Sequence, residues 1–303
     1  MRICRLATVV LLIAAASVGS ACAQEGDAVA RGEYVFRAGG GCSCHTDIKQ
    51  GGAFLAGGRA LKTPFGIFYS PNITPDRETG IGGWSVADFV RAMREGIGPD
   101  GAHYFPVFPY TSFTNATDGD LKDLKAYLDT VAPVRKRNRA HDVAAPFGWR
   151  VSVGPWKWLF FEKGPFRPEP GRSKAWNRGA YLATALAHCG ECHTPRNALA
   201  GLDGDMWFAG TKDGPEGELA PNITPHAGTG IGRWSAADLA GLLKTGRKPD
   251  FDDVQGLMAE AIEQGYKYLD DADLEAIAEY VRSLPPIDNR VEAKSTAPRS
   301  PYE

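Results

Sequence analysis

The chain has 303 residues, which is enough for two domains of ordinary size, each with its own apolar core. Its formal net charge of −2 excludes the strongly basic surface that marks nucleic-acid-binding proteins. Beyond residue 18, no apolar run is long enough to predict a membrane-spanning helix.

Residues 1–23 have the pattern of a secretory signal peptide. A basic start is followed by the apolar run 6–18 and by the small residues Ala21 and Ala23. We predict cleavage after Ala23 and a periplasmic mature protein. The alternative interpretation is a lipoprotein signal, in which Cys22 would carry a lipid.

The four cysteines beyond the signal peptide form two close pairs, each followed at once by a histidine. The two motifs are Cys42-Ser43-Cys44-His45 and Cys189-Gly190-Glu191-Cys192-His193. The second is the attachment signature of a c-type haem, because cysteines three apart on a helix can both bond the porphyrin vinyl groups while the adjacent histidine coordinates iron. A zinc half-site or a thioredoxin-like redox pair is the alternative.

The first motif has one residue between its cysteines, and the chain from the preceding tyrosine to the histidine is one residue shorter here. If the deletion falls between the cysteines, Cys42 corresponds to Cys189. If the helix keeps its register, Gly41 takes that place and Cys42 is turned away, since residues two apart on a helix differ by about 200°. In both cases Cys44 can form a thioether and His45 can bind iron, so we predict haem at Cys42, Cys44 and His45.

Two parts of the chain match at a nearly constant offset, and this repeat predicts the architecture. The matching segments are 31–34 with 178–181, 71–75 with 221–225, and 79–85 with 229–235. We therefore predict two copies of one haem-binding domain, at 24–134 and 174–287.

Each copy is expected to contain two helices besides the one that carries the cysteines. Ser85 and Ser235 each begin a capping box, with an aspartate three residues later. Closing helices at 118–130 and 271–284 show apolar residues at helical spacing, and a proline follows each of them. With glycine- and proline-rich loops and little strand, the predicted fold class is all-α.

Residues 135–173 separate the two copies. They are rich in proline and glycine but carry more aromatic residues than a flexible linker would: Phe147, Trp149, Trp156, Trp158, Phe160, Phe161 and Phe166. We predict an extended linker packed over the domains, with a partner-binding surface as the alternative. The polar tail 288–303 is predicted to be disordered.

Methionine is the usual second ligand of a cytochrome c iron. Met258 lies in a predicted loop that can swing back over the far face of the second haem. Met206 lies beside Trp207 and Phe208, a position typical of a residue that lines the haem pocket without binding the iron. We predict Met258 as the iron ligand opposite His193.

The first copy has no methionine at the corresponding place. Subtracting the repeat offset from Met258 gives Phe108, another position where relatives place methionine holds Ala116, and Met93 maps to helix core. His103 as a ligand, an open iron position, or no haem at all are the three alternatives.

The whole mature chain resembles the multihaem cytochrome c subunits of periplasmic alcohol, gluconate and sugar dehydrogenases. The motifs that carry the resemblance are Cys-Gly-Glu-Cys-His-Thr-Pro-Arg-Asn at 189–197, the two Pro-Asn-Ile-Thr-Pro loops, the Gly-Ile-Gly-x-Trp-Ser segments, and 158–161 with 164–168 of the linker. The resemblance implies two tandem class I cytochrome c-like domains, and it matches Met258 to the axial methionine. Many relatives carry three haem motifs; this chain has two.

The resemblance also implies a function, electron transfer without catalysis. The expected donor is a flavin- or quinone-dependent dehydrogenase subunit, the expected acceptor is the respiratory chain, and any peripheral membrane association would come through a partner. The alternatives are a dihaem peroxidase-like enzyme and a gas sensor, each using an open first haem.

Overall fold

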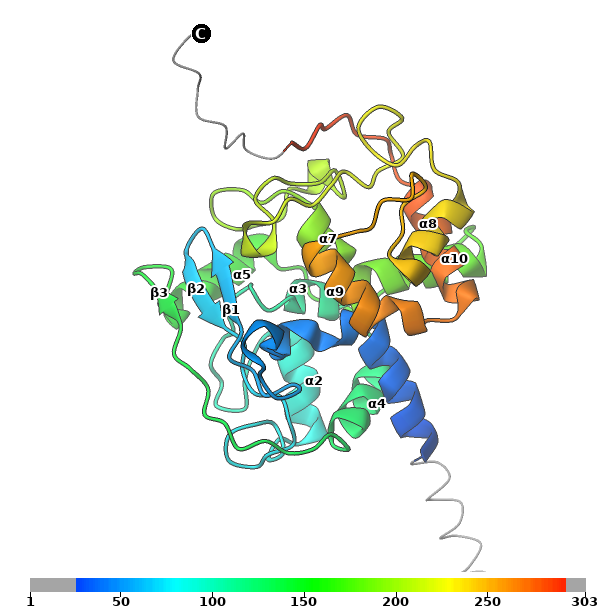
Figure 1. Ribbon diagram of the computed structural model, residues 1–303. Helices are drawn as coiled ribbons and strands as arrows, with labels where there is room; N and C mark the ends of the chain where they lie inside the picture. Colours follow the sequence, from blue (N-terminus) through cyan, green and yellow to red (C-terminus); the bar gives the residue numbers. More distant parts are fainter. Residues whose placement is uncertain (1–25, 293–303) are drawn as a thin grey trace, which may run out of the picture.

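The computed structural model describes residues 26–292, so the predicted signal peptide and the last eleven residues of the tail lie outside the described part (Figure 1). The described chain is mostly helical, with one small antiparallel sheet of strand order β1-β2-β3. No helix between residues 26 and 292 combines the length and the apolar character needed to cross a membrane. The mostly helical content agrees with the predicted all-α class, in which little strand was expected, and the three short strands are its one departure in the described residues.

The first half starts with a helix at 26–38. The elements that follow are η1 (Gly40–His45), η2 (Ile48–Gln50), β1 (Ala60–Thr63), β2 (Gly66–Tyr69), α2 (Val86–Glu95), α3 (Tyr110–Phe113) and α4 (Asp118–Leu128). Ser85 and Asp88 form the predicted capping box of α2. The closing helix begins at the predicted residue and ends two residues early.

The second half repeats the helices of the first in the same order, with added helical turns, but its described residues form no counterpart of β1 and β2. Its elements are α6 (Lys174–Tyr181), the π-helical turn η4 (Leu182–Leu186), α7 (Cys189–His193), η5 (Gly204–Met206), η6 (Pro215–Gly217), α8 (Ala236–Thr245), α9 (Gly256–Gln264), η7 (Tyr266–Tyr268) and α10 (Asp271–Arg282). The capping box of Ser235 and Asp238 is confirmed. Met258 lies in the helix α9, whereas the sequence predicted a loop.

Residues 135–173 lie against the rest of the molecule but are not extended throughout. They form β3 (Asp142–Val143), η3 (Arg150–Ser152) and α5 (Val153–Phe160). Val153 is buried against Phe68 and Phe105, and β3 pairs with β2 in antiparallel register. The helix α5 is a feature that the prediction of an extended segment missed.

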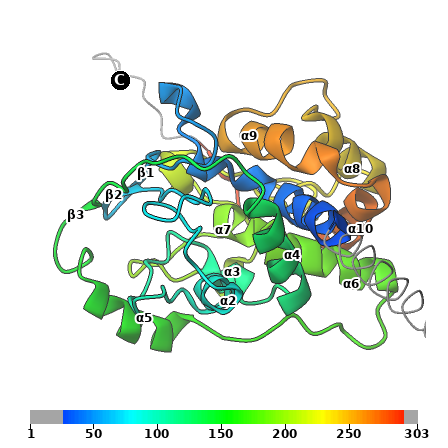
Figure 2. The same cartoon turned by 90° about the horizontal axis from the view of Figure 1, so that it is seen from below.

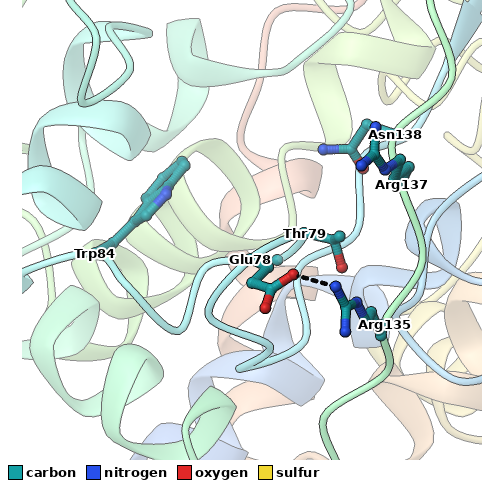
Figure 3. A pocket seen from close by; sticks show the side chains of 7 residues that line it. Glu78, Thr79, Trp84, Arg135, Arg137 and Asn138 are labelled. Atoms are coloured by element: carbon teal, nitrogen blue, oxygen red, sulfur yellow. Dashed lines mark hydrogen bonds and ion pairs between the residues drawn. The ribbon is translucent and has the colours of Figure 1, made fainter.

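The Pro-Asn-Ile-Thr-Pro loops have matching hydrogen bonds in both halves. The side-chain amide of Asn72 donates to the Val134 carbonyl at 2.7 Å, and that of Asn222 donates to the Ile287 carbonyl at 2.8 Å. Figure 3 shows the extended segment that carries Arg135, Arg137 and Asn138 beside Glu78 and Thr79, which follow the loop of the first half. The buried asparagine explains why each half needs a returning segment after its closing helix, because an unpaired buried amide is costly.

The returning segment of the second half corrects the predicted start of the disordered tail. The side-chain amide of Asn289 donates to the Ala209 carbonyl at 2.8 Å, and its backbone N–H donates to the Thr229 hydroxyl at 3.1 Å. Residues 288 and 289 are therefore part of the folded structure.

The two halves share one continuous core. Each half also donates a side-chain hydrogen bond to the other. Tyr34 of the first half donates its hydroxyl hydrogen to Asp273 of the second at 2.7 Å, while Tyr181 of the second donates to Asp120 of the first. The repeated tyrosine therefore joins the halves in both directions.

Candidate haem-attachment sites

Both motif histidines have the same partner. His193 Nδ1 lies 2.8 Å from the Pro221 carbonyl oxygen, and His45 Nδ1 lies 2.8 Å from that of Pro71. A carbonyl only accepts, so Nδ1 carries the hydrogen and Nε2 keeps its lone pair for a metal. Burial lowers the pKa of both imidazoles, which keeps them neutral. The repeated Pro-Asn-Ile-Thr-Pro loop thus orients each histidine as an iron ligand.

The backbone around each histidine is matched as well. Gly57 N–H donates to the His45 carbonyl at 2.8 Å, and Gly210 N–H donates to the His193 carbonyl at 2.7 Å. Both glycines have positive φ, and a Cβ on either would lie 2.4 Å from the backbone of the proline loop. Only glycine fits this approach.

The one-residue difference between the halves lies in the helix before the motif. Gly39 N–H donates to the Val35 carbonyl, four residues back, whereas Ala187 N–H donates to the Leu182 carbonyl, five residues back. A π-helical turn of this kind holds one extra residue. The residues that follow, Gly40 and His188, are both left-handed.

This register favours the second of the two predicted alternatives, in which Gly41 corresponds to Cys189. Cys42 is nevertheless not turned away, since the 200° argument assumes a right-handed helix. Gly41 and Cys42 have φ of 67° and 46°, both left-handed, a conformation that costs a non-glycine residue about 1 kcal/mol.

The left-handed turn gives Cys42 surroundings like those of Cys189. Both side chains are partly buried against the core. Burial raises the pKa of Tyr127, with a smaller contribution from Cys42, and burial likewise raises the pKa of Tyr280, with a contribution from Cys189. These tyrosines occupy equivalent positions on α4 and α10, so each of the two thiols lies near the matching tyrosine of its own half.

The four thiols are unpaired. Burial raises the pKa of Cys42, Cys189 and Cys192 to about 12, and it also raises the pKa of Cys44. Cys42, Cys189 and Cys192 are therefore neutral near pH 7. In the described part of the chain, no group of three or more His, Cys, Asp or Glu is arranged to hold a metal ion.

The structure brings the two motifs together around Tyr266. This buried phenol donates to the Ala187 carbonyl at 3.1 Å, and its pKa is raised by burial and further by Cys189, Cys192 and Cys44. On the side of the first motif, a Cβ on Gly40 would lie 3.7 Å from the Tyr266 oxygen.

Each motif is also covered by a short element of the other half, as the neighbouring positions of α9 and the first motif in Figure 2 illustrate. At the second motif, the hydroxyls of Thr111 and Ser112 donate to the Glu191 carboxylate at 2.6 and 2.8 Å. The Phe113 ring meets the His188 ring edge to face at 5.4 Å. These contacts were not predicted, because nothing in the motif itself shows what Glu191 binds.

A buried ion-pair cluster beside the first motif also escaped prediction. The Arg59 guanidinium donates to Glu216 at 2.8 Å and to Glu260 at 2.5 Å. Arg59 belongs to the first half and both glutamates to the second. The cluster therefore fixes η6 and α9 next to Cys44, whose pKa all three charges influence.

The predicted iron ligand Met258 lies partly buried in the first turn of α9. The N–H of Leu257 donates to the Glu218 carboxylate at 2.9 Å, which holds the start of this helix. Met206 lies in η5 next to Trp207, whose ring stacks on Phe208 with centroids 4.8 Å apart.

The positions considered for the first distal ligand have other contacts. Phe108 packs in an aromatic cluster with Tyr104, Tyr110 and Phe113. Ala116 is fully buried. His103 Nδ1 lies 3.0 Å from the Lys157 ammonium, which together with burial lowers the histidine pKa.

The pocket in Figure 3 is a different site. Its volume of about 630 Å³ is in the range of small-molecule sites, but it is an open surface groove. Glu78 and Arg135 pair across it, and Trp84 lies at one side. None of the predicted haem residues lines it.

Comparison with known proteins identifies the family of this chain. A family model for cytochrome c matches residues 177–285. The diheme cytochrome c-type protein of Cereibacter sphaeroides is 43% identical over 267 residues, covering 85% of this chain and 86% of the relative. This chain belongs to the cytochrome c family.

Other cytochrome c relatives are longer than this chain. The fructose dehydrogenase cytochrome subunit of Gluconobacter japonicus is 44% identical, over 85% of this chain and 52% of the relative. The alcohol dehydrogenase (quinone) cytochrome c subunit of Gluconobacter oxydans is 37% identical, over 90% of this chain and 58% of the relative. The chain thus spans little more than half of these two, and the resemblance to dehydrogenase cytochrome subunits is confirmed.

The residues fit haem c on three observations. Both histidines present a free Nε2, and the four cysteines are unpaired. In addition, the buried hydroxyl of Tyr110 has no hydrogen-bond partner among the described residues, although its phenol lies near Glu191 in the second motif. An unpaired buried hydroxyl in a native fold calls for a further polar group.

Proposed function

We propose that this protein is a dihaem electron carrier of the periplasm, built from two tandem cytochrome c domains at 24–134 and 174–287 that the segment 135–173 joins. It accepts electrons from a flavin- or quinone-dependent dehydrogenase subunit and passes them towards the respiratory chain. The periplasmic location rests on the signal peptide predicted at residues 1–23. The partner rests on the names of the relatives.

At the second site, Cys189 and Cys192 would hold the haem through thioethers, and His193 and Met258 would bind its iron. At the first site, Cys42 and Cys44 would hold the haem, and His45 would bind its iron. When bound, haem c supplies reversible one-electron transfer at its iron. The protein orients the imidazoles through the carbonyls of Pro71 and Pro221.

The observation that carries this proposal is the pair of matched histidines in two motifs that meet around Tyr266. Each imidazole is fixed by its own proline carbonyl, and the single side chain of Tyr266 contacts both motifs. Two redox groups bound at these motifs would therefore both lie near the Tyr266 side chain. This arrangement suits a carrier that passes electrons between two centres.

The intact mass of the mature protein, made in a host with haem-attachment machinery, tests the proposal together with a pyridine haemochrome spectrum. We expect a mass for two haems. A mass for one haem would make the first half a docking or structural module, and a mass without haem would refute the proposal.

The spectrum also tests Cys42. With both Cys42 and Cys44 attached, the α-band of the first haem matches that of the second. In Cys42→Ala, part of the α-band should shift towards the single-thioether position while the mass still shows two haems. An unshifted band in that variant would show that Cys42 forms no thioether.

A peroxidase-like enzyme would need an acid or base near the first haem, and His103 is the only candidate for that role near Phe108 in the sequence. Its surroundings give the enzyme hypothesis no support. The Lys157 ammonium lies at its Nδ1, and the Arg150 guanidinium binds its carbonyl at 2.6 Å. We expect no peroxide turnover by the dihaem protein. Carbon monoxide binding to the reduced first haem separates an open iron from a ligated one.

A further inference from the structure

Helix α5 turns its charged side chain towards the protein. The Lys157 ammonium donates to the carbonyls of Glu95 and Gly96, at 2.5 and 2.9 Å, and lies 4.5 Å from the centroid of the Tyr110 ring. Val153 on the same face is buried. A surface helix normally does the opposite, with charges outward and apolar residues inward.

The outer face of α5 is apolar and exposed. Val151, Trp158 and Leu159 are 79%, 85% and 56% exposed, and Pro155 between them is exposed too. Pro155, Trp158 and Leu159 follow Val151 by four, seven and eight residues, so the four side chains lie on one side of the η3–α5 segment. Trp149, 59% exposed, extends this surface towards β3. We call these five residues the α5 face.

The α5 face has the size of a protein interface. At about 200–250 Å² for each tryptophan, the two tryptophans alone expose about 300 Å². The aliphatic residues add to this, so the face reaches or exceeds the largest apolar patch of a typical monomer, about 300–600 Å². One partner of a standard interface buries about 800 Å², of which a little over half is apolar.

The α5 face is continuous with the chain that leaves the second motif. Trp156 Nε1 donates to the Leu199 carbonyl at 2.7 Å, and Phe160 packs against Gly201. Leu199 is itself exposed. It lies six residues after His193, and Arg196 in the same loop pairs with Glu191 of the motif. A molecule docked on α5 therefore lies beside the second haem-attachment site.

We propose that the α5 face is the docking surface for the dehydrogenase subunit that donates electrons. This inference rests on the electron-transfer function proposed above. The partner should present an apolar hollow for Trp158 and a carboxylate for Arg150, whose guanidinium lies 5.3 Å from the Phe105 ring centroid at the edge of the face. Tryptophan and arginine are the residues that most often dominate binding energy at interfaces.

The rim of the α5 face argues for a protein partner over a membrane surface. Arg150 lies at one end of α5, while Glu162 and Lys163 are exposed at the other. A rim with both signs of charge is typical of protein interfaces. Anionic lipid headgroups attract surfaces in which basic residues cluster alone.

A photo-crosslinking amino acid at position 158 tests the inference in the full-length holoprotein in its own periplasm. We expect a crosslink to a dehydrogenase subunit, identified by mass spectrometry. The control places the same amino acid at Phe251, which is 81% exposed in the loop between α8 and α9. Both views show α8 on the opposite side of the molecule from α5 (Figures 1 and 2).

Crosslinks from position 158 to a second copy of this chain, to lipid alone, to a protein of another class, or to nothing would overturn the inference. So would the same dehydrogenase crosslink from position 251. Because Trp158 is exposed, Trp158→Ala should keep both haems, which the intact mass verifies.

The captured dehydrogenase then gives a kinetic test. Its substrate-driven reduction of the haems should slow at least 10-fold in Trp158→Ala and stay unchanged in Phe251→Ala, with reduction by ascorbate equal in all three proteins. Equal rates for the wild type and Trp158→Ala would refute the docking surface alone. A mature protein without haem would instead refute the proposed function.

Discussion

Replacing Gly179 by alanine should force α6 away from α10 and destabilise the second half. A Cβ built on Gly179 lies 1.8 Å from the Ala276 carbonyl oxygen, while real Cβ atoms essentially never approach within 3.0 Å. The helices must therefore separate by at least 1.2 Å at this crossing. Overpacking of a core costs about 1–3 kcal/mol, and we expect the upper end because the obstacle is backbone.

Thermal unfolding of the holoprotein, followed by circular dichroism, measures this cost. A loss of about 3 kcal/mol lowers the melting temperature by roughly 6–12 °C for a chain of this size. Gly32→Ala should behave alike, because its Cβ would lie 1.9 Å from the Asp123 carbonyl oxygen at the equivalent crossing of the first half.

Gly241→Ala is the matched control, since it lies inside α8 with nothing within 4 Å of an added Cβ. This change should stabilise the protein by up to about 1 kcal/mol, through helix propensity. A melting temperature of Gly179→Ala within one degree of the wild type would contradict the close packing of α6 on α10.

Three further predictions concern the site and its surroundings. Met258→Ala should abolish the methionine–iron charge-transfer band of the oxidised protein and lower the reduction potential of the second haem; an unchanged band would refute the assignment. Arg59→Met should cost about 2–4 kcal/mol because Glu216 and Glu260 lose their partner, and adding Glu216→Leu and Glu260→Leu should recover most of it in denaturant titrations. Burial lowers the pKa of Lys157 to about 8, so between pH 8 and 10.5 the unfolded chain binds more protons and stability should rise with pH; Lys157→Met should lack this rise in melts at pH 7.5 and 10.

The parts of the fold that follow local rules could be predicted from the sequence. Both capping boxes and the starts of α4 and α10 are where the serine, threonine and aspartate patterns indicated. A cap depends on hydrogen bonds within four residues, so the sequence contains nearly all the necessary information. The returning segment at Asn289 was taken for disorder because its partners, Ala209 and Gly210, lie about 80 residues away.

The exchanged contacts between the halves could not be predicted, although the repeat itself was visible. Tyr34 and Tyr181 were recognised as equivalent, but equivalence does not show that each bonds to the other half. The same holds for Thr111 and Ser112 on Glu191. Such contacts depend on how the two halves pack, and no local pattern sets that packing.

The same packing accounts for the unusual spacing of the first motif. Gly41 corresponds to Cys189 in register, yet a Cβ at Gly41 would lie 2.5 Å from the Gln264 carbonyl oxygen at the end of α9. A cysteine therefore does not fit at position 41 while α9 covers this motif. At the second motif the covering element is α3, which has only four residues, and Cys189 has room.

Moving the cysteine to position 42 would turn it away on a right-handed helix, but the left-handed backbone at Gly41 and Cys42 brings it back towards Tyr127. The shorter spacing between the cysteines and the left-handed backbone at Gly41 and Cys42 thus compensate for each other. Gly40, which is also left-handed, packs against Ala261 of α9 and Tyr266. The short spacing is therefore the form of the motif that fits beneath α9, and it still places the Cys42 thiol against the core.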